Sequence, residues 1–173
     1  MTGTLAPEFS RPVVLARLGA DRFRQQIAAT EAERAALARR FCLVALDRLS
    51  ASVSLARHGE DMFLLRAEFD AEFVQSCVVT LDPVSGAVSE QFTLLFGPPD
   101  AEAAAAGTVG DDVAFEPLVR DVIDIGEAVA QEFSLALPPF PRSPHVDDGA
   151  EPPAPDESGP FAVLSRFLDR RGA

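Results

Sequence analysis

The chain has 173 residues, the length of about one domain, and 47% of them are hydrophobic, with 13 Phe but no Trp or Tyr. Its formal net charge of −12 excludes a protein that grips nucleic acid over its whole surface, because phosphate binding is carried by clustered cations. No apolar run approaches the ~20 residues of a bilayer crossing, and no signal-peptide pattern opens the chain. We therefore expect a cytoplasmic protein without membrane association.

The charge is unevenly distributed. Residues 11–48 carry 8 Arg against 4 acidic residues, whereas residues 49–173 carry 7 Arg against 22 acidic residues. All of these cations are arginines, whose planar guanidinium groups suit bidentate contacts with phosphate or carboxylate. The candidate RNA contacts in the basic part are Arg22, Arg24, Arg34, Arg39 and Arg40. A solvated helix face is the alternative interpretation of the last three.

The first elements are a short strand and a helix. Residues 9–18 are rich in branched apolar side chains, and Pro12 restricts them to an edge strand or a strand start. Thr30 and Glu33 have the spacing of a capping box, which predicts a helix that runs to about Phe41 or Ala45. Leu37 and Phe41 belong to its predicted apolar face.

Alternating residues then predict an antiparallel meander. Apolar residues alternate with serines over residues 50–55, a turn follows at residues 58–61, and the alternation resumes over residues 63–69. The second strand is expected to continue through Cys77 and Val79. Residues 82–86 contain a Pro and a Gly and predict a turn, after which residues 88–96 return as another strand.

The second half is expected to begin with a low-complexity loop over residues 97–112, followed by a short strand over residues 115–119. Asp124 then has the position of a helix N-cap, and apolar residues at helical spacing follow it as far as Pro138. Residues 142–158 are acidic and proline-rich, which predicts a disordered linker between a domain of residues 1–141 and a short apolar helix of residues 159–173.

No pattern in the sequence indicates catalysis. The chain lacks a glycine-rich phosphate loop and a GxSxG motif, and neither histidine lies near a plausible nucleophile. Cys42 and Cys77 both lie in apolar surroundings and are interpreted as small core residues. We therefore expect no enzyme, no catalytic residue, no metal site and no cofactor.

Three blocks carry a family resemblance: IDIGEAVAQEFSLALPPFP from Ile123, GPFAVLSRF from Gly159, and CVVTLDPV from Cys77. Together they resemble the bacterial YceD family, the large ribosomal RNA subunit accumulation proteins. The positions that match the family pattern are Cys77, Pro83, Ile123, Asp124, Val129, Glu132, Leu135, Leu137, Pro138, Pro141, Pro160, Phe161 and Leu164. Many members have Cys-x-x-Cys in the central block, but Thr80 takes the second position here, so no metal site is carried over.

The resemblance implies a factor needed for accumulation of large-subunit ribosomal RNA. One hypothesis is an RNA-contacting assembly factor that uses the arginines named above on precursor RNA or an assembling particle. The alternative is an acidic module, or chaperone, for a basic large-subunit ribosomal protein. The terminal apolar helix would dock on the domain itself or on a partner.

The predicted fold class is α+β. An antiparallel meander of about four to six strands is expected to pack with two main helices and the short C-terminal helix.

Overall fold

The computed structural model describes residues 7–19, 22–59, 61–101, 113–118 and 120–145. Its strands are β1 (Pro12–Val14), β2 (Phe23–Ala28), β3 (Ala45–His58), β4 (Met62–Ser76), β5 (Pro83–Gly97), β6 (Ala114–Pro117) and β7 (Val122–Asp124). Its α-helices are α1 (Glu31–Arg40) and α3 (Ile125–Ala136), and its short 3-10 helices are η1 (Leu15–Arg17) and η2 (Pro99–Ala101).

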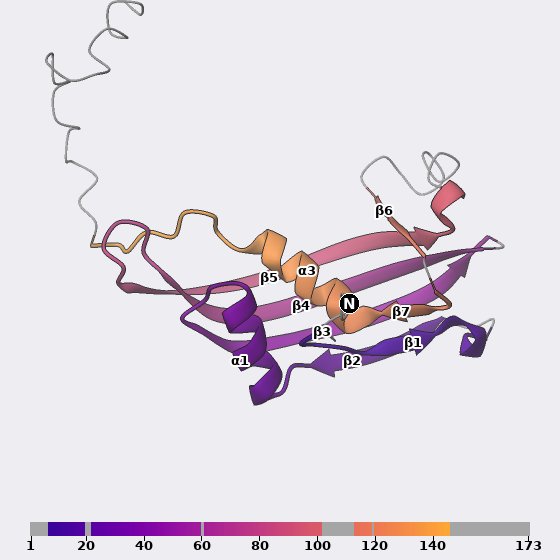
Figure 1. Cartoon of the computed structure of the whole chain (residues 1–173), viewed down its shortest axis with the longest axis horizontal. Helices are drawn as coiled ribbons and strands as arrows, with labels where there is room; N and C mark the ends of the chain where they lie inside the picture. Colours follow the sequence, from indigo (N-terminus) through magenta and orange to yellow (C-terminus); the bar gives the residue numbers. More distant parts are fainter. Residues whose placement is uncertain (1–6, 20–21, 60, 102–112, 119, 146–173) are drawn as a thin grey trace, which may run out of the picture. The chain divides into compact units, whose positions relative to one another are not determined.

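Five strands form one sheet in the order β2-β3-β4-β5-β6, and β1 pairs with β7 in a separate two-stranded sheet (Figure 1). The predicted α+β class, with a sheet of four to six strands and two main helices, is confirmed. The expected C-terminal helix over residues 159–173 lies outside the described residues. Within the described parts of the chain, no helix is long and apolar enough to cross a membrane.

The first strand of the central hairpin is longer than the sequence predicts, and the second strand ends earlier. β3 begins at Ala45 rather than near Ala51, because a register shift between Leu46 and Arg48 lets the strand keep pairing across residues that break the alternation. β4 ends at Ser76, so the prediction that this strand continues through Cys77 and Val79 is wrong, because the chain already turns at those residues. The two strands are therefore paired over almost their whole lengths, from His58 opposite Met62 onward.

The predicted turn at residues 82–86 is wrong. The chain turns over residues 77–82 instead, and Pro83 already pairs with Ser76 as the first residue of β5. Leu81, not a glycine, has the positive φ of 63° in this turn. Gly86 lies in the strand, where a Cβ would come within 2.7 Å of the Phe73 ring, so the glycine is needed for space.

The last strand of the sheet departs from a meander. β6 pairs with β5 in parallel, with Leu94 opposite Ala114. A parallel pair cannot be joined by a tight hairpin, so β6 does not continue the meander. Residues 102–112, between the two strands, lie outside the described residues.

The core lies between one face of the sheet and α3. Ala51, Val53 and Leu55 of β3 are buried, as the alternation predicts. Phe133 of α3 is fully buried and makes edge-on contacts with Phe41, Phe69 and Phe73. Its ring centroid lies 5.8 to 6.3 Å from theirs. Such aromatic pairs add about 0.5–1.5 kcal/mol each beyond area burial.

Both ends of α1 follow recognisable rules. Thr30 and Glu33 form the predicted capping box, with each side chain bonded to the other's backbone N–H. At the other end, Leu43 N–H donates to Ala38 O and Cys42 N–H to Arg39 O, the pattern of a Schellman motif. Cys42 therefore has φ of 56° and is exposed, so its predicted core role is wrong.

The chain divides into one compact unit of residues 1–143 and a second of residues 144–173, of which only Pro144 and His145 are described. The fold and the sites below belong to the first unit. The predicted linker and terminal segment remain predictions.

Candidate nucleic-acid interface on the sheet

The five-stranded sheet has an apolar face toward α3 and a polar face on its other side. Successive residues of a strand point to opposite faces, and directly paired residues share a face. Because Val53 and Leu55 are buried, Ser52 and Ser54 lie on the polar face, together with the residues paired to them in β2 and β4. The register therefore assigns every described residue of β2–β5 to one face.

One lateral line on this face is cationic. The pairing places Arg24 opposite Ser54, Ser54 opposite Arg66, and Arg66 opposite Thr93. We call these four residues the arginine row. Strands lie about 4.8 Å apart, so two strand spacings, roughly 10 Å, separate the Cα atoms of the two arginines. Both arginines are exposed, and Arg22 precedes β2 beside the same hollow as Arg24, Ser52 and Ser54.

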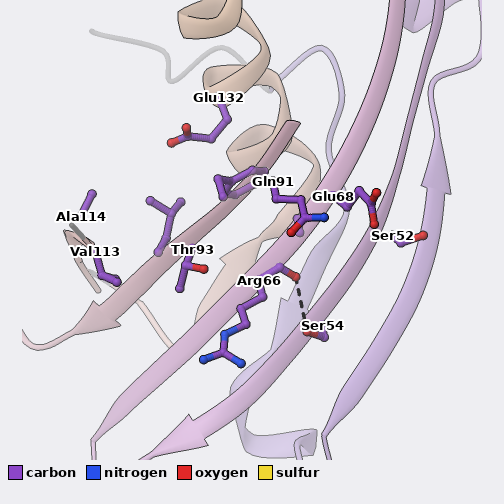
Figure 2. A pocket seen from close by; sticks show the side chains of 12 residues that line it. Ser52, Ser54, Arg66, Glu68, Gln91, Thr93, Val113, Ala114 and Glu132 are labelled. Atoms are coloured by element: carbon purple, nitrogen blue, oxygen red, sulfur yellow. Dashed lines mark hydrogen bonds between the residues drawn. The ribbon is translucent and has the colours of Figure 1, made fainter. Parts of the chain in front are cut away.

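The adjacent line carries amides and a carboxylate. Gln26 lies opposite Ser52, Ser52 opposite Glu68, and Glu68 opposite Gln91. We call these four residues the amide row. All four are exposed. One open hollow of ≈ 700 Å³ is bordered by members of both rows, and Figure 2 shows Arg66, Ser54 and Thr93 beside Glu68, Ser52 and Gln91.

The arginine row has no carboxylate partner in the described structure. The ion pairs there join Arg11 to Glu33, Arg40 to Glu8 and Glu127, and Arg48 to Glu72. Ser54 Oγ donates to Arg66 O, a backbone atom, which leaves the Arg66 guanidinium uninvolved (Figure 2). The row therefore presents two guanidinium groups to solvent.

The five arginines expected to contact RNA fall into two places. Arg22 and Arg24 border the polar face, whereas Arg34, Arg39 and Arg40 lie on α1. Arg40 donates to both carboxylate oxygens of Glu127, at 2.9 and 2.7 Å, and also to Glu8. These contacts raise the pKa of Arg40 and occupy its donors. Arg40 is thus poorly placed for phosphate.

Of the other two arginines on α1, Arg34 donates to Ala29 O at 2.9 Å and Arg39 is exposed. Sequence reasoning missed Arg66, which comes from the acidic part of the chain. The alternation of apolar and polar residues could have placed Arg66 on the polar face. The sequence could not show that Arg66 and Arg24 both pair with Ser54, one from each side of β3.

Two family-pattern residues have structural roles at the start of α3. The Asp124 carboxylate accepts hydrogen bonds from Gly126 N–H and Glu127 N–H, so it is the predicted N-cap. It also accepts from Arg11 N–H at 2.7 Å and from Ser10 Oγ. Ile123 is buried in β7 opposite Val13. Asp124 therefore joins the N-terminal segment to α3.

A second group of family-pattern residues meets at the turn between β4 and β5. Val78 N–H donates to Pro141 O at 2.9 Å, and Gln75 Nε2 donates to Pro138 O at 3.1 Å. These bonds hold the segment after α3 against the turn. Pro83 lies at the turn's end, while Pro160, Phe161 and Leu164 lie outside the described residues.

Cys77 at this turn is buried, as the sequence predicts, and its sulfur is in addition a hydrogen-bond acceptor. It is fully buried, and its Sγ accepts from Thr80 N–H at 3.4 Å, Ser143 N–H at 3.3 Å and Val79 N–H at 3.5 Å. Hydrogen bonds from the Thr80 side chain, the Thr80 backbone and the Ser143 backbone lower the pKa of Cys77 to about 6. Burial acts in the opposite direction, so the hydrogen bonds outweigh it.

The remaining family-pattern positions belong to α3. Val129 is fully buried against the sheet, Leu135 is exposed, and Leu137 ends the helix as its C-cap. Burial raises the pKa of Glu132, and the negative charges of Glu116 and Glu90 raise it further. These three carboxylates form an acidic cluster beside β5. Among the described residues, no group of three His, Cys, Asp or Glu side chains could hold a metal ion.

Comparisons with known proteins give one match. A family model described as large ribosomal RNA subunit accumulation protein YceD matches residues 65–162, more than half of the chain. The matched span begins in β4 and includes β5 and α3. No curated protein and no solved structure matches the chain.

Proposed function

The chain belongs to the YceD family of large ribosomal RNA subunit accumulation proteins, and on this premise we propose that it is a non-enzymatic ribosome-biogenesis factor. It supports accumulation of large-subunit ribosomal RNA by binding precursor RNA or an assembling large-subunit particle. It acts through contacts rather than chemistry, and it needs no cofactor.

The observation that carries the proposal is the arginine row. Arg24 and Arg66 are exposed on one face of the sheet, and no carboxylate of the described residues pairs with either of them. Exposed guanidinium groups that have no carboxylate partner can neutralise phosphates without first breaking an ion pair. The surrounding negative charge weakens nonspecific attraction, which limits binding to places where the row and the RNA backbone fit.

The test is RNA binding by the double variant Arg24→Gln/Arg66→Gln. We expect it to bind large-subunit precursor RNA at least tenfold more weakly than the wild type. Each lost phosphate contact also reduces the slope of log K against log salt by about 0.7–0.9. Arg39→Gln is the matched control, because it removes the same kind of charge from α1. A loss with Arg39→Gln but not with the double variant would place the interface on the helix and refute this assignment.

A second candidate function is the acidic module for a basic large-subunit ribosomal protein. The raised pKa of Glu132 beside Glu116 and Glu90 favours it, because mutual repulsion among carboxylates is relieved by a cationic ligand. A pull-down from growing cells, washed with and without ribonuclease, separates the two functions. Recovery of a basic ribosomal protein after ribonuclease would support the acidic module; recovery that depends on intact RNA would support the first proposal.

A further inference from the structure

The polar face has two parallel rows of different chemistry. The arginine row and the amide row are two residues apart along each strand, which corresponds to about 7 Å. Both run across the strands rather than along them. A third line, formed by Ser50, Asp70 and Ser89, continues on the acidic side. The face therefore changes from a cationic row with two arginines to two lines that each carry one carboxylate, Glu68 in the amide row and Asp70 in the third line.

From this order, and resting on the function proposed above, we infer that the face binds single-stranded RNA in one orientation. The phosphodiester backbone lies along the arginine row, and the base edges lie over the amide row. Glu68 cannot approach a phosphate without repulsion, but its carboxylate accepts from the amino groups of bases. Gln26 and Gln91 can both donate to and accept from base edges.

The absence of aromatic side chains from both rows determines how bases are recognised. Among the described residues, Phe115 of β6 is an aromatic residue close to the two rows. Its ring packs against Gly97: a Cβ added to this glycine would lie 3.1 Å from the ring. Without a stacking platform, recognition depends on hydrogen bonds to base edges. In an A-form duplex the Watson–Crick edges are paired and the major-groove edges are enclosed in a deep, narrow groove, while the shallow minor groove is recognised mostly by shape. The expected ligand is therefore an unpaired segment of RNA.

The experiment measures binding of short RNA oligomers to the full chain by fluorescence anisotropy. The probes are oligo-A, oligo-C, oligo-U and a blunt RNA duplex of equal length. We expect the wild type to bind at least one single-stranded probe fivefold or more tightly than the duplex. Arg24→Gln/Arg66→Gln should weaken binding to all single-stranded probes by a similar factor and lower the salt slope, because phosphate contacts carry no sequence information.

Glu68→Gln is the decisive variant. It keeps the size and an acceptor oxygen but adds a donor and removes the charge, so the ratio of affinities for oligo-C and oligo-U should change by about fivefold or more. The matched control is Asp70→Asn, which removes one charge from the same strand and face but lies outside the amide row. It should leave that ratio unchanged. Urea unfolding of each variant verifies that the fold is retained.

The outcomes separate this inference from the function on which it rests. If Glu68→Gln and Asp70→Asn raise the affinity for every probe by the same factor, Glu68 only repels RNA and the inference is overturned. A wild type that prefers the duplex overturns it as well, while RNA binding itself is retained. If the wild type binds no RNA, including precursor RNA from cells, the proposed RNA-binding function fails and the inference with it.

Discussion

Replacing Asp124 with Ala tests how strongly one carboxylate holds the two ends of the fold together. The carboxylate accepts from Gly126 N–H at 3.1 Å and Glu127 N–H at 3.2 Å at the start of α3, and from Arg11 N–H and Ser10 Oγ in the N-terminal segment. Alanine leaves these donors without their acceptor. The change should therefore act on the helix end and on the N-terminal segment at once.

The size of the effect follows from these contacts. Loss of an N-cap costs about 0.5–2 kcal/mol of unfolding free energy. A hydrogen bond from a backbone N–H to a charged group contributes about 1.5–3 kcal/mol. The two contributions share one side chain and are not strictly additive, so we expect a total of roughly 2–4 kcal/mol. For a domain of this size this corresponds to a fall of about 5–15 °C in Tm.

The measurement is urea unfolding at pH 7, followed by circular dichroism, for the wild type, Asp124→Ala and Asp124→Asn. Asn is the matched control, because it keeps an acceptor for the cap while it removes the charge, so its cost should be no more than about half that of Ala. A loss of unfolding free energy below about 0.5 kcal/mol for Asp124→Ala would refute the claim that this carboxylate links the N-terminal segment to α3. If Asp124→Ala and Asp124→Asn lost equal amounts of unfolding free energy, the charge of Asp124, and not its hydrogen-bond acceptor, would be what stabilises the fold.

Three further changes have effects of defined sign. Gly126→Ala places a Cβ 2.3 Å from Phe9 O, a backbone atom, so thermal unfolding should show a loss of about 1–3 kcal/mol; a stabilised variant, as helix propensity alone predicts, would contradict the close approach. Glu132 has a raised pKa, so its protonated form contributes stability that is fully present below pH 4.5 and lost as the pH rises. Glu132→Gln should therefore be more stable than the wild type at pH 7 and lose this advantage toward pH 4, whereas a constant difference would refute the assignment. The pKa of Cys77 is lowered from 9.0 to about 6, so its contribution is present above pH 9 and lost as the pH falls through about 6. The stability difference between wild type and Cys77→Ala should shrink from pH 9 to pH 5.5, and a difference independent of pH would exclude a stabilising thiolate.

Features that depend on neighbours along the chain could be predicted from the sequence. The Thr30–Glu33 capping box and the Asp124 N-cap were predicted because each is formed by residues two or three positions apart. The alternation of serines with apolar residues likewise identified the buried face of β3, since the side-chain period of a strand is a property of its backbone.

Some elements were missed because their local patterns are weak. β2 has only one buried residue, Ile27, and it is a strand because β3 supplies its partner. The turn before β5 was placed too late because Pro83 and Gly86 have the composition of a turn, yet both lie in a paired strand. Tertiary pairing overrode local propensity at these positions.

The candidate interface was decided by the tertiary structure alone. Arg24 and Arg66 are 42 positions apart, and one lies in the basic part of the chain while the other lies in the acidic part. They share a row only because both pair with Ser54, one from each side of β3. Register joins distant segments through hydrogen bonds that no local pattern records, and a shift of one residue in either pairing would move an arginine to the other face of the sheet.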